Sequence, residues 1–212
     1  MNAGVIFDMD GTLLNTLEDL TDAVNVALEQ NGYPKRTLEE MRLFVGNGAA
    51  NMIRKAAPQG ADQQAVMDAF VKYYGAHCQD KTRPYDGIME ALEALKAKYK
   101  VAVVSNKPDY AVKLMCRHIF PGVHGVGEIR GIPRKPAPDM VWAAMKEIGA
   151  DKCVYIGDSD VDLATARNSG LPCISVLWGF RTRQELEADG ADCFCEDPTQ
   201  LEAIVDKVIA GL

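Results

Sequence analysis

Long hydrophobic runs and an excess of basic residues are both missing from this sequence of 212 residues. No stretch approaches the roughly 18–20 consecutive apolar residues that a membrane-spanning helix needs, so we expect no membrane partner. The 30 acidic residues outnumber the 23 Lys and Arg, which gives a formal net charge of −7. This balance disfavours a nucleic-acid partner, because binding to a phosphate backbone depends on clustered positive charge.

Cysteine motifs and a secretory leader are also missing. The six cysteines are scattered, and Cys193 with Cys195 is a lone C-x-C that lacks the two further ligands of a zinc site. We interpret all six as reduced, structural thiols. The first residues, MNAGVIFDMD, contain only a short apolar stretch that ends in carboxylates, so no signal peptide is predicted. These features indicate a cytoplasmic protein.

The hydrophobic fraction of 48% is sufficient for a buried core. Short β-branched runs alternate with amphipathic stretches, which predicts an α/β fold: a doubly wound parallel sheet of the Rossmann-like kind. The predicted strands are residues 4–7, 101–104, 153–156 and 173–176. The predicted helices between and after them are residues 88–98, 110–118, 139–148, 161–168 and 201–209.

A long interval after the first strand breaks this alternation. Its apolar spacing is helical over residues 17–30, 48–57 and 62–78, with Gly and Pro between the helices. We therefore predict a helical insertion over residues 15–81 and a Rossmann-like core made of residues 1–14 and 82–212. Ligands of such sheets bind beyond the carboxyl ends of the strands, so the insertion is expected to act as a cap over the site.

Polar side chains follow the predicted strands at the points where the strands end. Because these ends lie along one edge of a doubly wound sheet, we expect the side chains to form one site, although each has a structural explanation when taken singly. The residues are Asp8, Asp10, Gly11 and Thr12 after the first strand, Ser105 and Asn106 after the second, Lys135 in a proline-flanked turn, and Asp158 and Asp162 after the third.

The acidic residues of this set indicate a metal site. Asp158, Asp160 and Asp162 are three acids within five residues, and they repel one another unless a cation compensates. Ligands that are all oxygen favour Mg²⁺. Asp158 and Asp162 are four residues apart, so they are expected to share one face of the helix that begins there, whereas Asp160 points elsewhere.

A carboxylate, a hard metal, a hydroxyl and a restrained lysine together indicate phosphoryl transfer. Two like charges ~4 Å apart repel by about 4 kcal/mol at an effective dielectric constant of ~20. A carboxylate that attacks a phosphate therefore needs its charge neutralised, and a metal ion together with Lys135 would do so.

The four segments resemble, in the same order, the four motifs of the haloacid dehalogenase superfamily, and the similarity covers essentially the whole chain. The resemblance implies that Asp8 is the nucleophile, which forms an aspartyl-phosphate, and that Asp10 is the general acid and then the base. It also implies that Mg²⁺ is held by Asp8, by the backbone carbonyl of Asp10 and by Asp158, with Asp162 as a supporting carboxylate. Ser105 and Lys135 match the family's phosphate-binding positions, and we expect Gly11, Thr12 and Asn106 to bind the substrate as well.

An acid at position 10 disfavours the dehalogenases and cation pumps of that superfamily and favours a phosphatase or a phosphomutase. The segments at residues 45–48, 105–108, 134–138 and 178–181 resemble those of phosphoglycolate phosphatases, which implies a small phosphorylated metabolite, 2-phosphoglycolate, as substrate. The turn Gly46-Asn47-Gly48 either places backbone amides over a substrate carboxylate or is a plain turn between helices. Residues 119–133 are rich in Gly and differ from the usual family pattern.

Several alternatives stay open. Pyrophosphatases, nucleotidases and sugar-phosphate phosphatases of the same family share these motifs, and so does a phosphomutase similar to β-phosphoglucomutase. A non-catalytic phosphoacceptor module also combines acids, a hydroxyl and a lysine, but it has no cap of this length and its lysine follows the last acids. The chain is expected to be a monomer or a homodimer.

Overall fold

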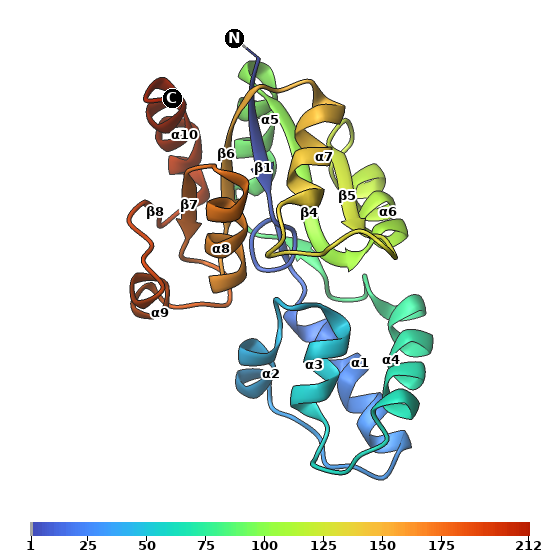
Figure 1. The fold of residues 1–212 in the computed structure, drawn as a ribbon. Helices are drawn as coiled ribbons and strands as arrows, with labels where there is room; N and C mark the ends of the chain where they lie inside the picture. Colours follow the sequence, from blue (N-terminus) through green and yellow to red (C-terminus); the bar gives the residue numbers. More distant parts are fainter. Residues whose placement is uncertain (1) are drawn as a thin grey trace. The chain divides into compact units, whose positions relative to one another are not determined.

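The computed structural model describes residues 2–212 and divides into two compact units (Figure 1). The larger unit contains the residues up to Leu13 together with Pro84–Leu212, and the smaller unit is Leu14–Arg83. Among the described residues, no helix has the length and apolar character needed to cross a membrane.

A six-stranded parallel sheet forms the centre of the larger unit. Its strands are β1 (Ala3–Phe7), β4 (Lys100–Pro108), β5 (His124–Glu128), β6 (Lys152–Gly157), β7 (Cys173–Val176) and β8 (Phe194–Cys195). Their order across the sheet is β5-β4-β1-β6-β7-β8. β1 pairs with β4 on one side and with β6 on the other, so the strand order changes direction at β1, the point where doubly wound sheets bind ligands. The predicted fold class is confirmed.

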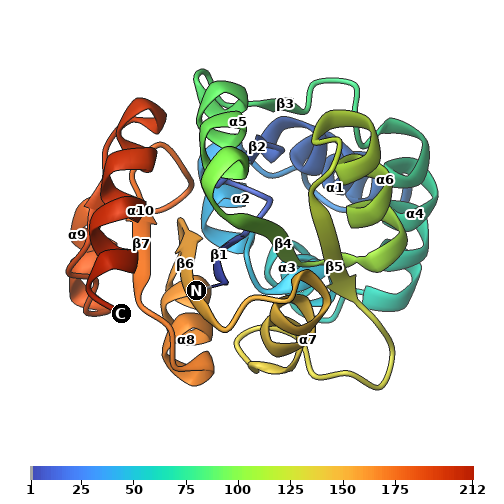
Figure 2. The same ribbon diagram turned by 90° about the horizontal axis from the view of Figure 1, so that it is seen from above.

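Helices cover both faces of this sheet, which explains why its inner strands are continuous apolar runs. α7 (Asp139–Ile148) and α8 (Asp160–Ser169) lie on one face, where Ile6, Val104 and Val141 are part of the buried core (Figure 2). α5 (Ile88–Lys98) and α10 (Leu201–Ala210) contact each other on the opposite face. The unit also contains α6 (Asp109–Ile119), α9 (Arg183–Ala188) and the 3₁₀ turn η1 (Pro198–Gln200).

Strand β5 lies inside the Gly-rich segment whose structure the sequence did not predict. Its glycines are required by close packing. A Cβ at Gly125 would lie 2.8 Å from Sγ of Cys116, and one at Gly127 would lie 2.5 Å from Cα of Asp109, so α6 approaches the bare backbone of the strand. Glycine has low strand propensity, and for that reason the sequence pattern did not indicate this strand. The two-residue strand β8 and the six-residue helix α9 were missed because they are too short for a periodic signal.

The smaller unit is helical. It contains α1 (Leu17–Gln30), α2 (Leu38–Phe44), α3 (Gly48–Ala56) and α4 (Gln63–His77). Three of these helices were predicted within one residue at either end; the short helix α2, which the sequence analysis missed, begins with a capping box between Thr37 and Glu40. The two-residue strands β2 (Leu14–Asn15) and β3 (Arg83–Pro84) form a separate small sheet.

Candidate active site

Asp8 lies directly after β1, and one of its two carboxylate oxygens contacts Lys135. Its backbone N–H donates to the carbonyl of Ile156 at 2.9 Å, which continues the pairing of β1 with β6. Oδ1 lies 2.8 Å from Nζ of Lys135, and the Asp8 side chain is only 9% exposed. Oδ2 has no hydrogen-bond partner in the part of the chain that the structure describes, residues 2–212. Asp8 is therefore fixed in position while retaining an oxygen that can react.

The turn after Asp8 contacts Asp158. Gly11 has a φ of 90°, in the left-handed region that favours glycine, and a Cβ there would lie 2.4 Å from Oδ2 of Asp158. The hydroxyl of Thr12 donates to Oδ1 of Asp158 at 3.1 Å. These two residues thus join the end of β1 to the end of β6, and their predicted contact with phosphate stays a prediction.

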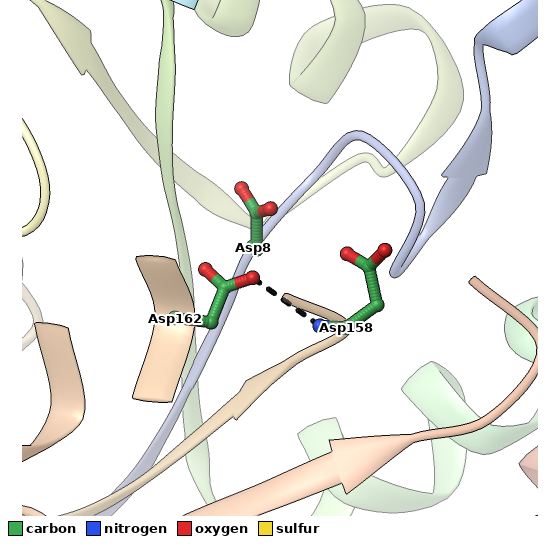
Figure 3. A group of neighbouring side chains, drawn as sticks. All are labelled: Asp8, Asp158 and Asp162. Carbon is green, nitrogen blue, oxygen red and sulfur yellow. Dashed lines mark hydrogen bonds between the residues drawn. The ribbon is translucent and has the colours of Figure 1, made fainter. Parts of the chain in front are cut away.

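Asp158 and Asp162 lie together at the end of β6, but the reason differs from the predicted one. Helix α8 begins at Asp160, so Asp158 precedes the helix and cannot share a helix face with Asp162. Asp162 instead turns back toward the start of its own helix. Its Oδ2 accepts hydrogen bonds from the backbone N–H of Ser159 at 3.1 Å and from the Ser159 hydroxyl at 2.6 Å. The same oxygen accepts one from the backbone N–H of Asp158 at 3.2 Å (Figure 3). Capping of α8 therefore fixes this carboxylate.

Three buried carboxylates meet at this point. Asp8, Asp158 and Asp162 each offer an oxygen, and these oxygens all lie within 4.8 Å of one another (Figure 3). Burial, reinforced by repulsion from Asp162, raises the pKa of Asp8 well above its ordinary value. The same two causes raise the pKa of Asp158 to about 7. The raised pKa values of Asp8 and Asp158, together with oxygen as the ligand atom of all three residues, fit a hard divalent cation such as Mg²⁺.

Lys135 supplies a buried positive charge to this cluster. Its Nζ lies 2.8 Å from Asp8, 2.8 Å from Asp162 and 3.0 Å from the hydroxyl of Tyr155, so all three N–H groups are directed at acceptors. Burial lowers the pKa of Lys135, but the attraction of Asp162 and Asp8 outweighs that effect and raises it well above its ordinary value. Lys135 is therefore a fixed cation.

Tyr155 is a member of this network that the sequence analysis missed. Its side chain is fully buried in β6, and its hydroxyl donates to Oδ1 of Asp162 at 3.1 Å while accepting from Lys135. The residue stands inside the apolar run Cys153–Ile156, where an aromatic side chain indicates only a buried strand. No signal in the sequence distinguished it from its neighbours.

Strand β4 brings a second set of polar groups to the same edge. Its pairing with β5 changes register between Val104 and Pro108, and the three residues within this irregularity, Ser105, Asn106 and Lys107, are all buried. The side-chain amide of Asn106 donates to the backbone carbonyl of Lys135 at 3.1 Å. Such register shifts redirect side chains near functional sites.

Lys107 is the second residue that the site prediction omitted. Its Nζ lies 3.1 Å from Oδ1 of Asp10, and its side chain is 3% exposed. A lysine so deeply buried needs a compensating charge, which Asp10 provides. The sequence signal was present, because Lys107 follows Ser105 and Asn106 at the end of a strand, but a lysine beside a predicted turn resembles an ordinary surface charge.

Nine of the predicted site residues lie in the larger unit: Asp8, Asp10, Gly11, Thr12, Ser105, Asn106, Lys135, Asp158 and Asp162. Seven of them are joined by contacts around Asp8, Asp158 and Lys135, and the other two, Asp10 and Ser105, both contact Lys107. Gly46, Asn47 and Gly48 lie in the smaller unit, in the turn before α3, where Gly46 and Gly48 have φ angles of 118° and 75°. The part of this turn in substrate binding stays a prediction.

Comparisons with known proteins find relatives among hydrolases of one family. The family described as haloacid dehalogenase-like hydrolase matches residues 5–176. A phosphoglycolate phosphatase of Xanthomonas campestris pv. campestris is 33% identical over 206 residues, covering 93% of each chain. One of Caulobacter vibrioides is 34% identical over 204 residues, covering 90% of this chain and 85% of the relative. A solved structure from Lactobacillus delbrueckii subsp. bulgaricus, provisionally identified as a phosphoglycolate phosphatase, has 39% identity and a TM-score of 0.90, covering 95% of this chain and 98% of that one.

Proposed function

The chain belongs to the haloacid dehalogenase-like hydrolases, and we propose that it hydrolyses a small phosphate monoester, 2-phosphoglycolate, through an aspartyl-phosphate on Asp8. The class of phosphoric monoester hydrolase is supported by the family and by relatives that are named phosphoglycolate phosphatases. The observation that carries the mechanism is the state of Asp8. One of its oxygens is held by Lys135 at 2.8 Å, and the other has no hydrogen-bond partner among residues 2–212.

The proposed reaction consists of two successive displacements at phosphorus. In the first, the open oxygen of Asp8 forms a bond to phosphorus while the ester P–O bond breaks, and protonated Asp10 gives its proton to the departing oxygen. In the second, Asp10 takes a proton from water, the water oxygen bonds to phosphorus, and the bond between phosphorus and Asp8 breaks. Lys135 holds Asp8 in place during both steps.

Mg²⁺ would be held by Asp8, by the backbone carbonyl of Asp10 and by Asp158. When bound, the ion supplies positive charge that offsets the repulsion between carboxylate and phosphate. Asp158 suits this role, since each of its oxygens accepts a single hydrogen bond, from Thr12 and from Phe180. Asp162 suits a supporting role better, because five donors from four residues already use its two oxygens.

The remaining predicted residues would bind the substrate. Ser105 and Asn106, with the turn at Gly11 and Thr12, would contact the phosphate oxygens. Residues 15–81 would act as the cap, and the backbone amides of the turn at residues 46–48 would hold the carboxylate of the leaving group.

Phosphate release from a panel of esters, measured with Mg²⁺ and with chelator, tests this proposal. The panel contains 2-phosphoglycolate, p-nitrophenyl phosphate, pyrophosphate, several sugar phosphates and several nucleotides. We expect Mg²⁺-dependent hydrolysis with a strong preference for 2-phosphoglycolate. Even turnover across the panel would contradict the substrate and leave the phosphatase chemistry standing. Isomerisation of a hexose phosphate without phosphate release would identify a phosphomutase, and no reaction with any member would overturn the proposal.

A further inference from the structure

The loop after β7, residues 177–181, reaches Asp158 although it belongs to none of the segments that carry the predicted catalytic and metal-binding residues. The backbone N–H of Phe180 donates to Oδ2 of Asp158 at 2.7 Å, and this contact is buried. A charge-assisted hydrogen bond of this length restricts the orientation of the carboxylate. The loop therefore sets the position of one of the oxygens available to a metal.

Gly179 lets the loop backbone come this close. A Cβ at this position would lie 2.3 Å from Cβ of Asp158, 2.5 Å from its Oδ2 and 2.5 Å from the carbonyl oxygen of Gly11. No side chain fits there without displacing Asp158 or the turn after β1. The loop is thus packed against both segments.

Trp178 connects the loop to the turn after β1 by a hydrogen bond. Its indole Nε1 donates to the backbone carbonyl of Thr12 at 2.9 Å, and the hydroxyl of Thr12 donates to Oδ1 of Asp158 at 3.1 Å. Trp178 is therefore connected through Thr12 to one oxygen of Asp158. The other oxygen is bound by Phe180, which belongs to the same loop as Trp178. Each oxygen of Asp158 is oriented by a donor from a different segment.

We propose that Trp178 is a positioning residue for Asp158, and that it sets the affinity of the site for a divalent cation. This inference rests on the proposed function in one respect, the role of Asp158 as a metal ligand. Groups that orient a metal ligand from outside typically change metal affinity by about 10–100-fold when they are removed. Trp178 acts through Thr12 and through the loop, so the lower end of that range applies.

The chain offers a matched control in Trp142, its other tryptophan. Trp142 lies on α7, it is 53% exposed, and its indole Nε1 also donates to a backbone carbonyl, that of Ser169, at 3.4 Å. Substituting Phe for either tryptophan removes an N–H donor and keeps an aromatic ring. The two variants differ in whether the lost donor is connected to Asp158.

The experiment measures binding of Mn²⁺ to the metal-stripped full chain by electron paramagnetic resonance, without substrate. We expect Trp178→Phe to raise the Kd by about 10-fold and Trp142→Phe to leave it unchanged. Thermal unfolding without metal verifies that both variants are folded. Gly179→Ala serves as a second variant; because its added Cβ collides with Asp158 itself, we expect it to weaken binding at least as much as Trp178→Phe.

Equal affinities for the two tryptophan variants would overturn the proposal. A second arm repeats Trp178→Phe in a chain that carries Asp158→Asn, at higher Mn²⁺ concentration. If Trp178 acts through Asp158, the substitution has no further effect there, whereas an undiminished loss would overturn the proposal. Wild-type protein that binds Mn²⁺ but hydrolyses none of the esters would contradict the proposed function and leave this inference intact.

Discussion

Two buried lysines, Lys135 and Lys107, lie in the same site, and each pairs with one aspartate of the turn after β1. Lys135 lies 2.8 Å from Asp8, and it is held by two further acceptors. Lys107 lies 3.1 Å from Asp10, whose side chain is 16% exposed, against 9% for Asp8. The proposed nucleophile is thus held by the network around Lys135, while the proposed acid and base is more accessible. This difference suits the proposed tasks, in which Asp10 exchanges protons with a leaving group and with water.

Of the changes to these two pairs, replacing the proposed nucleophile, Asp8, should lower activity most. We expect Asp8→Asn to lower turnover by at least about 1,000-fold, because the amide cannot attack phosphorus. The fold should persist, since the change removes one of three crowded carboxylates. Phosphate release and circular dichroism measure the two outcomes. Turnover close to that of the wild type would exclude a covalent bond to Asp8.

Lys135→Met should cause the largest loss of stability. The substitution leaves the buried carboxylates of Asp8 and Asp162 without their cation, and breaking a buried ion pair from one side costs about 3–5 kcal/mol. Denaturant unfolding of the metal-free protein measures this cost. Methionine preserves most of the volume of the lysine side chain, so the measured loss of unfolding free energy is due to the missing charge.

Lys113→Met is the control for this change. Lys113 also pairs with an aspartate, Asp109, at 2.7 Å, but its side chain is 53% exposed. Exposed pairs contribute about 0–1 kcal/mol, so the control should be nearly neutral. Equal losses in the two variants would contradict the view that the network around Lys135 is a buried electrostatic unit.

Much of this site could be predicted from the sequence, and the omissions share a physical cause. Asp8, Lys135 and Asp158 stand at strand ends or in restrained turns, where a charge is conspicuous beside an apolar run. Tyr155 was missed because its hydroxyl belongs to an aromatic residue inside a buried strand, where the apolar ring alone explains its presence. The backbone N–H of Phe180 was missed because almost every residue type carries a main-chain donor. Residue identity therefore does not indicate which donor contacts the site, and only the folded structure shows it.

The raised pKa of Asp158 predicts that the stabilisation of the fold by Mg²⁺ depends on pH. Between about pH 4 and about pH 7, folded Asp158 retains a proton that the unfolded chain has lost, because its pKa is raised to about 7. This group therefore stabilises the metal-free fold as pH falls through 7, and the full repulsion is present only above that pH. We expect the rise in Tm on adding Mg²⁺ to be larger at about pH 8 than at about pH 5.5. The stability difference between the two pH values should be smaller than the loss caused by Lys135→Met, because a proton taken up by Asp158 limits the repulsion among the three carboxylates.

Calorimetry at both pH values, with and without Mg²⁺, measures this difference. Asp158→Asn is the matched control, because it removes the titrating group and one proposed ligand while nearly preserving shape. In that variant, the rise in Tm should be small at both pH values. A rise that is equal at the two pH values in the wild type would contradict a link between the protonation of the cluster and metal binding.

Lys107→Met should destabilise the fold less than Lys135→Met does. The substitution removes the cation beside one carboxylate, Asp10, whereas Lys135→Met leaves two carboxylates without their cation. We therefore expect a loss of about 1–3 kcal/mol, below that of Lys135→Met. Unfolding of Lys107→Met in a chain that carries Asp10→Asn tests the cause. There the loss should shrink, because the asparagine bears no charge to be left uncompensated. A loss as large as that of Lys135→Met would show that Asp10 is held as tightly as Asp8, and the contrast between nucleophile and acid would disappear.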